Sequence, residues 1–222
     1  MRISLNALIL LCISMPVSAA DDAGVQAFKI IDEAVAAIDG QVVTQSQLEF
    51  EARVLLVNGG GVEAAFALLD EPALRAALNT MIDQRLATLE ADKLEAYALD
   101  PGELEQAVTA FRARFKDEGR YRQFLQAHEA DGNDVAAVLR RGLRAQRILE
   151  SRVRLKAQVS PAEAARLAGG RADLKGLPIE TVRSKLFSER YGALVKAELQ
   201  QARKSTDVRL LGRWAVAAGA RQ

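Results

Sequence analysis

The sequence predicts a mainly α-helical protein with a small β-sheet that joins the two ends of the chain. Helix start signals and apolar residues at helical spacing follow one another through the middle of the 222-residue chain. Short β patterns stand near the ends, as a hairpin around Asp39-Gly40 and as a strand that holds Val208 and Leu210. Because a lone two-stranded hairpin is only marginally stable in water, we expect the last strand to add to it.

The predicted hairpin leads straight into the first helix. Thr44 and Gln47 have the spacing of a capping box, in which each side chain bonds to the backbone N–H of the other residue. This spacing predicts a helix from Gln45 to Val57. The Asn-Gly-Gly-Gly run at 58–61 ends it, because glycine favours helix termination.

Further helices follow, most of them with a start signal of their own. Glu71-Pro72 and Asp100-Pro101 place proline in the first turn, where its missing N–H is tolerated, and Glu103 stands at the third helical position. Ser160-Pro161 opens a helix that Gly169-Gly170 cuts short. The expected apolar residues are Leu74, Leu78, Met81, Ile82, Leu86 and Leu89 in the helix after Glu71; Leu104, Val108, Phe111 and Phe115 in the helix after Asp100; Tyr121, Phe124 and Leu125 in a shorter helix; and Val182, Leu186, Tyr191, Leu194, Val195 and Leu199 in a final helix from Pro178 to Lys204.

A long helix is predicted from about Asp134 to Lys156. Its apolar residues gather on one side of a helical wheel, and four arginines gather on the other: Arg140, Arg144, Arg147 and Arg154. Two interpretations of this arginine face stay open. It is either a solvated helix face or a contact for acidic or polar segments of a partner.

The N-terminus has the organisation of a secretory signal peptide. Arg2 is followed by an apolar run from Ile3 to Met15, which is shorter than the roughly 20 residues that a membrane span needs. Small residues then predict cleavage after Ala19 or Ala20. We therefore expect an exported, periplasmic protein with no stable membrane span.

Composition narrows the classes of function. The single cysteine, Cys12, lies in the predicted signal peptide, so the mature chain would form no disulfide. Cleavage also removes the charge of Arg2, which takes the formal net charge from +1 to 0. A neutral chain has no global attraction to nucleic acid or anionic lipid, and we expect no nucleic-acid partner.

No catalytic, metal or cofactor site is expected. His128 is the one histidine, and general acid–base or metal chemistry needs partners that the pattern does not supply. Adjacent acids such as Asp117-Glu118 fit helix starts, where they complement the helix dipole. The glycine run at 58–61 lacks the Lys-Ser/Thr of a phosphate loop.

Adaptable apolar side chains form the candidate peptide-binding set. Aromatic rings and methionine suit grooves that accept varied polypeptides, although the same residues also suit a packed core. The candidates are Met81, Phe111, Phe115, Tyr121, Phe124 and Leu125.

The order of these elements resembles the SurA family of periplasmic chaperones. The stretches that carry the resemblance are VAAIDGQVVTQSQLEFEARVLL, LRAALNTMIDQRLATLEADKL, LDPGELEQAVTAFRARF, VLRRGLRAQRILESRVRLKAQVSPAEA and VRLLGRW, within residues 34–211. The resemblance implies a multi-helix core completed by the C-terminal strand. SurA-like proteins usually carry parvulin-type prolyl isomerase domains after the Ser-Pro-Ala-Glu helix, but here about ten residues join that helix to the last one.

The resemblance therefore implies a SurA-like core without the isomerase domain. The expected organisation is a signal peptide at 1–19, a leader at 20–33, a SurA N-terminal-like helical core at 34–168, a short linker at 169–177, and a C-terminal helix and strand at 178–214. The implied function is ATP-independent binding of unfolded outer-membrane or secreted polypeptides. Two alternatives stay open: a dedicated assembly or adaptor protein for one specific partner, and a residual peptidyl-prolyl isomerase.

Overall fold

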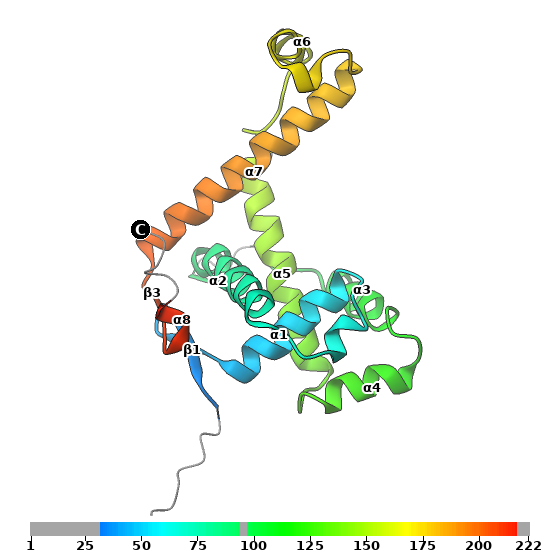
Figure 1. Ribbon diagram of the computed structural model, residues 1–222, viewed down its shortest axis with the longest axis vertical. Coiled ribbons are helices and arrows are strands. Elements are labelled where there is room, and N and C mark those ends of the chain that lie inside the picture. Colours follow the sequence, from blue (N-terminus) through cyan, green and yellow to red (C-terminus); the bar gives the residue numbers. More distant parts are fainter. Residues whose placement is uncertain (1–31, 94–96, 217–222) are drawn as a thin grey trace, which may run out of the picture. The chain divides into compact units, whose positions relative to one another are not determined.

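The computed structural model describes residues 32–93 and 97–216 (Figure 1). Helices dominate, as predicted, and three short strands form one antiparallel sheet. The elements are β1 (Ala34–Ile38), β2 (Gln41–Thr44), α1 (Gln45–Asn58), η1 (Ala64–Phe66), α2 (Glu71–Lys93), α3 (Pro101–Arg112), α4 (Glu118–Gln126), α5 (Gly132–Val153), α6 (Pro161–Gly170), η2 (Ala172–Leu174), α7 (Ile179–Ser205), β3 (Val208–Leu210) and α8 (Arg213–Val216). The predicted signal peptide and most of the predicted leader lie outside the described residues.

The sheet confirms that the two ends of the folded part meet. The strand order is β2-β1-β3, with β1 in the centre and antiparallel to both neighbours. Ala36 pairs with Leu210 and Ile38 pairs with Val208. Asp39 and Gly40 have φ angles of 49° and 80°, as a type I′ hairpin turn requires. Figure 1 shows β3 and α8, both red, beside the blue β1.

The capping signals at two predicted helix starts are also confirmed. The Thr44 side chain accepts a hydrogen bond from the Gln47 N–H, and the Gln47 side chain accepts one from the Thr44 N–H. The Ser160 side chain accepts from the Glu163 N–H at the start of α6. Each bond satisfies a backbone N–H that the helix leaves without an internal partner.

Other predicted boundaries were wrong by a few residues. The long helix α5 begins at Gly132 rather than Asp134, because Asp131 caps it by accepting from the N–H groups of Asn133 and Asp134. It ends at Val153 rather than Lys156. Asp100 precedes α3 as predicted, but its side chain makes no capping hydrogen bond. The short elements η1, η2 and α8 were not predicted from the sequence.

Three hydrophobic clusters stabilise the fold. The sheet core joins β1, β2, α1 and α2 to Trp214; the aromatic core joins α1, α3, α4 and α5; and the hairpin core joins α6, η2 and the first half of α7. The buried members of the sheet core are Val35, Ala36, Ile38, Val43, Leu48, Ala52, Leu74, Ala77, Leu78, Met81, Ile82, Leu86 and Trp214. Those of the aromatic core are Val54, Val57, Ala65, Phe111, Phe115, Tyr121, Phe124, Val135, Val138 and Leu139. Those of the hairpin core are Val159, Ala164, Leu174, Val182 and Leu186.

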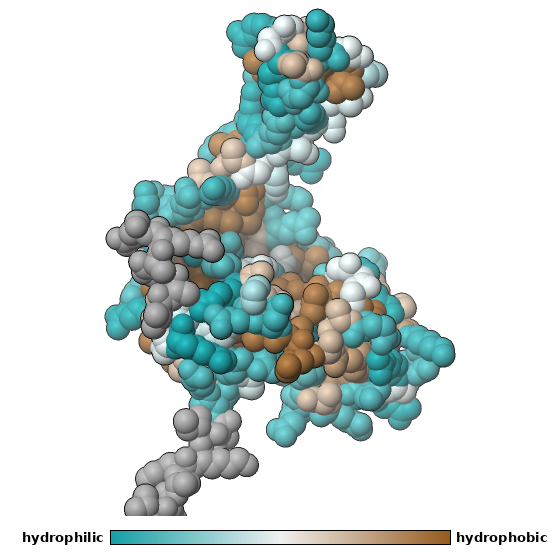
Figure 2. All heavy atoms as spheres, viewed as in Figure 1, coloured by the Kyte–Doolittle hydropathy of each residue, from teal (hydrophilic) through white to brown (hydrophobic). Residues whose placement is uncertain are grey.

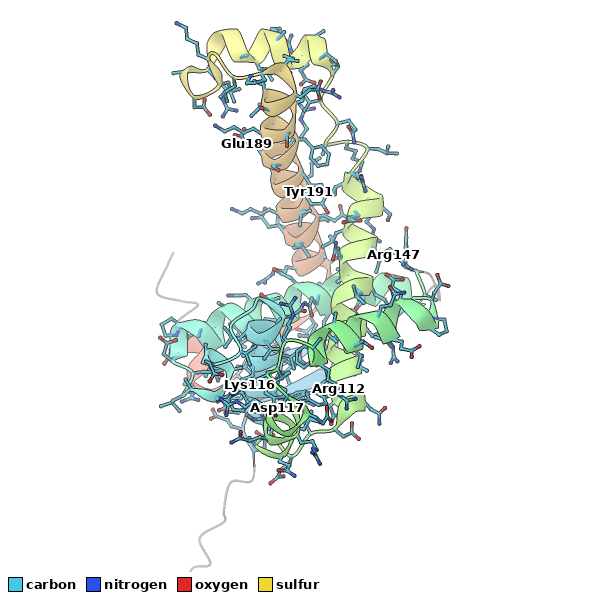
Figure 3. All side chains as sticks on the ribbon, turned by 90° about the vertical axis from the view of Figure 1, so that its right-hand side faces the viewer. Arg112, Lys116, Asp117, Arg147, Glu189 and Tyr191 are labelled. Atoms are coloured by element: carbon cyan, nitrogen blue, oxygen red, sulfur yellow. The ribbon has the colours of Figure 1, made fainter. Side chains whose placement is uncertain are left out.

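The predicted apolar line of α7 is only partly buried. Val182 and Leu186 lie in the hairpin core. Tyr191 and the three residues expected after it are partly exposed. The reason is that α7 changes partners along its length: its first half packs on α6, and α7 also packs on α2 and α5. Figure 3 labels Glu189 and Tyr191 on this helix.

Candidate binding groove

An apolar groove lies between α3, α5 and the end of α2. Its volume is about 960 Å³, near the upper end of the roughly 300–1,000 Å³ that is typical of ligand pockets. The groove is lined by Asp92, Ala98, Leu99, Asp100, Pro101, Leu104, Glu105, Val108, Thr109, Gly132, Asn133, Ala136, Arg140 and Arg144. We call it the α3–α5 groove.

The apolar wall of the groove comes from one face of α3. Leu104 and Val108 stand one helical turn apart, so their side chains lie on the same face. Both are half-buried, and both pack on the aromatic core. Phe111, on the same helix, is fully buried in that core and anchors α3. The groove wall is therefore the partly exposed edge of a well-packed cluster.

The opposite wall comes from α5 and carries arginines of the predicted arginine face. Arg140 is exposed at the groove, and within the described residues it forms no ion pair. Arg144 forms an ion pair with Asp92 of α2. Arg147, labelled in Figure 3, pairs with Glu103 and donates to the Ala98 carbonyl at 2.8 Å. Two of the four arginines thus tie α5 to its neighbours, while Arg140 and Arg154 remain exposed.

The structure places five of the six predicted peptide-binding residues inside cores. Phe111, Phe115, Tyr121 and Phe124 are buried together in the aromatic core, where Phe124 lies 5.4 Å from Phe115 between ring centroids. Met81 is fully buried in the sheet core and does not join them. Leu125 is half-buried against the aromatic core. Direct contact between these buried rings and a polypeptide would require the cluster to open.

Leu104 and Val108 were predicted to lie on an apolar helix face but were not among the candidate binding residues. A signal in the sequence that could have selected them is their spacing from Phe111. Val108 lies one turn and Leu104 two turns before Phe111, on the helix that packs against α5. The rings of the candidate set are buried, because large rings bury more apolar area than aliphatic side chains and so tend to occupy the interior.

His128 packs as an aromatic ring. It follows α4 and lies 5.5 Å from Phe124 and 6.1 Å from Phe50 between ring centroids. Burial, and then the nearby Arg53 guanidinium, lower the pKa of His128 below its usual value, since both disfavour the charged ring. A half-buried ring among phenylalanines fits a packing role.

A second apolar groove lies between α1 and the start of α2. Its volume is about 410 Å³, and it is lined by Ala52, Leu55, Leu56, Gly59, Gly61, Leu69, Ala73, Ala76, Ala77 and Thr80. Figure 2 shows hydrophobic surface, in brown, over α1 and the neighbouring elements. Like the α3–α5 groove, it exposes aliphatic side chains beside a core.

The described residues hold no cluster of three or more histidine, cysteine or acidic side chains placed to bind a metal ion. Among the same residues, no helix combines the length and the hydropathy that crossing a membrane requires.

The described residues form a mainly helical domain whose small sheet joins the two ends of the folded part. The chain belongs to the family of the SurA-like N-terminal domain, whose model matches residues 3–149, more than half of its length. This domain is the chaperone-type part of SurA-like proteins. No curated protein matches the chain.

The segment between α6 and α7 is short, as the sequence indicated, and departs here from the usual SurA-like organisation. Residues 171–178 join Gly170 to Ile179 and contain only the single turn η2. Leu174 of η2 is fully buried, so this connection is packed against both helices. In the described chain, α6 and α7 form a continuous helical hairpin.

Proposed function

We propose that the protein is an ATP-independent periplasmic chaperone that binds unfolded outer-membrane or secreted polypeptides in the α3–α5 groove. The observation that carries the proposal is the α3–α5 groove itself, a mainly apolar pocket of about 960 Å³ in a SurA-like N-terminal domain. The export signal read from the first 19 residues supports the location.

Binding in the groove combines apolar contact with weak electrostatic attraction. Leu104 and Val108 offer aliphatic surface that is already partly removed from water, so a client side chain adds contact without a large rearrangement. Arg140 adds a positive charge at the opposite wall. Such contacts are weak and reversible, which suits a chaperone that must release its client.

The aromatic core supports the groove in this proposal. Phe111, Phe115, Tyr121 and Phe124 hold α3 and α4 together, and Leu125 closes the cluster at its edge. Substitutions of these residues would change binding through the position of α3. Met81 packs in the sheet core and does not support the groove in this proposal.

We also propose that the protein has no prolyl isomerase activity, because the place of a parvulin domain is taken by residues 171–178. A protease-coupled assay with a proline-containing peptide tests this point. We expect no isomerisation rate above the uncatalysed background; a rate proportional to protein concentration would overturn the proposal.

Peptide binding by the mature protein tests the chaperone function. Fluorescent unfolded outer-membrane-protein peptides are titrated, with scrambled and aromatic-free peptides for comparison. The variant Leu104→Gln/Val108→Thr should weaken binding about tenfold, since it removes roughly 1–2 kcal/mol of apolar contact.

Leu68→Gln is the matched control for these groove substitutions. Leu68 is 96% exposed and lies outside the groove, so its replacement should leave binding unchanged. If no peptide binds the unsubstituted protein, the chaperone proposal fails. If both variants weaken binding equally, the α3–α5 groove is not the binding site.

A further inference from the structure

A second, smaller pocket adjoins the α3–α5 groove and is rich in arginine. It has a volume of about 220 Å³ and lies between α2, α5 and the β1–β2 hairpin. Four arginines line it: Arg85, Arg140, Arg141 and Arg144. The other lining residues are Ile38, Gln41, Thr88, Leu89, Asp92 and Ala137. We call it the arginine pocket.

Positive charge exceeds negative charge in this pocket. Among the described residues, the acids that face the four guanidinium groups are Asp92 and Glu51. Asp92 pairs with Arg144. The Glu51 carboxylate forms ion pairs with two arginines. It is hydrogen-bonded to Arg141, and its Oε1 lies 3.9 Å from a terminal nitrogen of the Arg85 guanidinium. Among these described side chains, four positive and two negative charges leave a formal excess of two positive charges.

Two of the guanidinium groups are poorly solvated as well as incompletely neutralised. The Nε atoms of Arg85 and Arg141 are buried and, within the described residues, have no hydrogen-bond partner. Burial, and then the neighbouring Arg141, lower the pKa of Arg85, and Glu51 only partly offsets them. Buried donors without partners are costly, and guanidinium groups whose charge is incompletely compensated form strong hydrogen bonds with an anion.

The arginine pocket borders the groove and shares lining residues with it. Asp92, Arg140 and Arg144 line both. A ligand with apolar groups in the groove can therefore place an anionic group among the arginines. A polypeptide has this combination of groups where its chain ends in a carboxylate.

We propose that the arginine pocket binds the C-terminal carboxylate of an extended polypeptide whose preceding apolar side chains lie in the α3–α5 groove. Guanidinium and carboxylate groups match in planar geometry and form paired hydrogen bonds. The small volume of the pocket suits a chain end, since an internal segment would have to enter and leave the same space. The inference rests on the proposed function, because it assumes that a polypeptide occupies the groove.

One peptide in three chemical forms tests the inference. An apolar, unfolded peptide is prepared with a free C-terminal carboxylate, with a C-terminal amide, and as an amide whose last residue is glutamate. Affinities are measured by fluorescence anisotropy at constant ionic strength. The amide should bind about tenfold more weakly than the free acid, which corresponds to loss of one charge-assisted contact.

Arg140→Gln should remove most of this preference for the free acid. Arg140 is exposed and, within the described residues, makes no ion pair, so its replacement leaves the packing intact. Arg154→Gln is the matched control, because Arg154 is an exposed arginine next to the end of the same helix and outside the pocket.

The outcomes separate this inference from the proposed function. If no form of the peptide binds, the proposed function fails. If acid and amide bind equally, the groove remains the binding site and the carboxylate inference is overturned. If the glutamate amide binds as tightly as the free acid, the pocket accepts a side-chain carboxylate and the assignment to the chain end is wrong. Equal effects of Arg140→Gln and Arg154→Gln would place the carboxylate elsewhere.

Discussion

The guanidinium of Arg75 lies over the indole ring of Trp214, with its Cζ atom 5.1 Å from the ring centroid. Arg75 belongs to α2, and Trp214 belongs to α8, directly after the last strand. Trp214 is also fully buried in the sheet core. This contact fastens the C-terminal segment to the helical body, in addition to the hydrogen bonds of β3.

Trp214→Ala should therefore destabilise the whole fold. Truncation of a large buried aromatic side chain typically costs about 3–5 kcal/mol, because contacts are lost and a cavity remains. Urea denaturation followed by circular dichroism measures the free energy of unfolding. Trp214→Phe should cost clearly less, because within the described residues the indole Nε1 has no hydrogen-bond partner to lose. Arg209→Ala, on the exposed side of β3, is the control and should have little effect. A small effect of Trp214→Ala would mean that the C-terminal segment contributes little.

Local signals in the sequence were sufficient to predict the hairpin and several helix starts, although not α8, which carries Trp214. The hairpin turn at Asp39-Gly40 and the cap at Ser160 depend on residues within a few positions of each other. A short backbone segment can satisfy such signals alone, whatever the rest of the chain does. Antiparallel addition of β3 to β1 could also be predicted, because a two-stranded hairpin needs a third strand or a helix to be stable.

The candidate site was harder to predict, because it depends on which apolar residues are left at the surface. Helical spacing places Leu104, Val108 and Phe111 on one face of α3, but it does not say which of them is covered. Packing of α4 and α5 buries Phe111 and leaves the other two half-exposed. Similarly, the ion pair between Glu51 and Arg141 joins residues that lie far apart in the sequence, so no local sequence pattern predicts it.

Glu51 provides a second prediction. Its side chain is 8% exposed and pairs with both Arg85 and Arg141, so Glu51→Gln leaves two guanidiniums with less compensation. We expect a loss of about 2–4 kcal/mol in the free energy of unfolding. Glu180→Gln is the matched control: the Glu180 side chain is 73% exposed and that of Arg183 is 33% exposed, so loss of this pair should cost less than about 1 kcal/mol. Equal losses in thermal or urea denaturation would contradict the buried role of Glu51.

Asp32 provides a prediction about pH. Hydrogen bonds from the Ser46 and Thr44 side chains lower the pKa of Asp32 from 3.8 to about 2, and its carboxylate accepts from the Ser46 hydroxyl at 2.5 Å. Because the pKa in the folded state lies below the ordinary value, this carboxylate stabilises the fold above about pH 4. That contribution is lost as the pH falls from about 4 to 2.

Asp32→Asn should therefore flatten the dependence of stability on pH in this range. Urea denaturation from pH 5 to pH 2 measures the difference between the variant and the unsubstituted protein. Ser46→Ala should give a similar but smaller change, because it removes the hydroxyl donor and leaves the carboxylate. Parallel curves for all three proteins would show that these hydrogen bonds contribute nothing to folding.

The helical hairpin of α6 and α7 provides the last prediction, which concerns local rather than global stability. Its core has five buried residues and is separate from the two larger cores. At its surface, Arg171 bonds to Asp173 and Glu189, and Lys185 also bonds to Asp173. Exposed ion pairs of this kind add little, so the stability of the hairpin depends mainly on its apolar residues.

Leu174→Ala should open this hairpin without unfolding the rest of the protein. Leu174 is fully buried in η2, and truncation of a buried leucine typically costs about 2–5 kcal/mol, which is large for so small a cluster. Hydrogen exchange followed by mass spectrometry should show faster exchange in residues 159–186 and unchanged protection in α1, α2 and α5, because small cooperative units open independently. Leu177→Ala is the control, since Leu177 lies in the same connection but is 41% exposed. Faster exchange throughout the chain would show instead that the hairpin and the main body unfold as one cooperative unit.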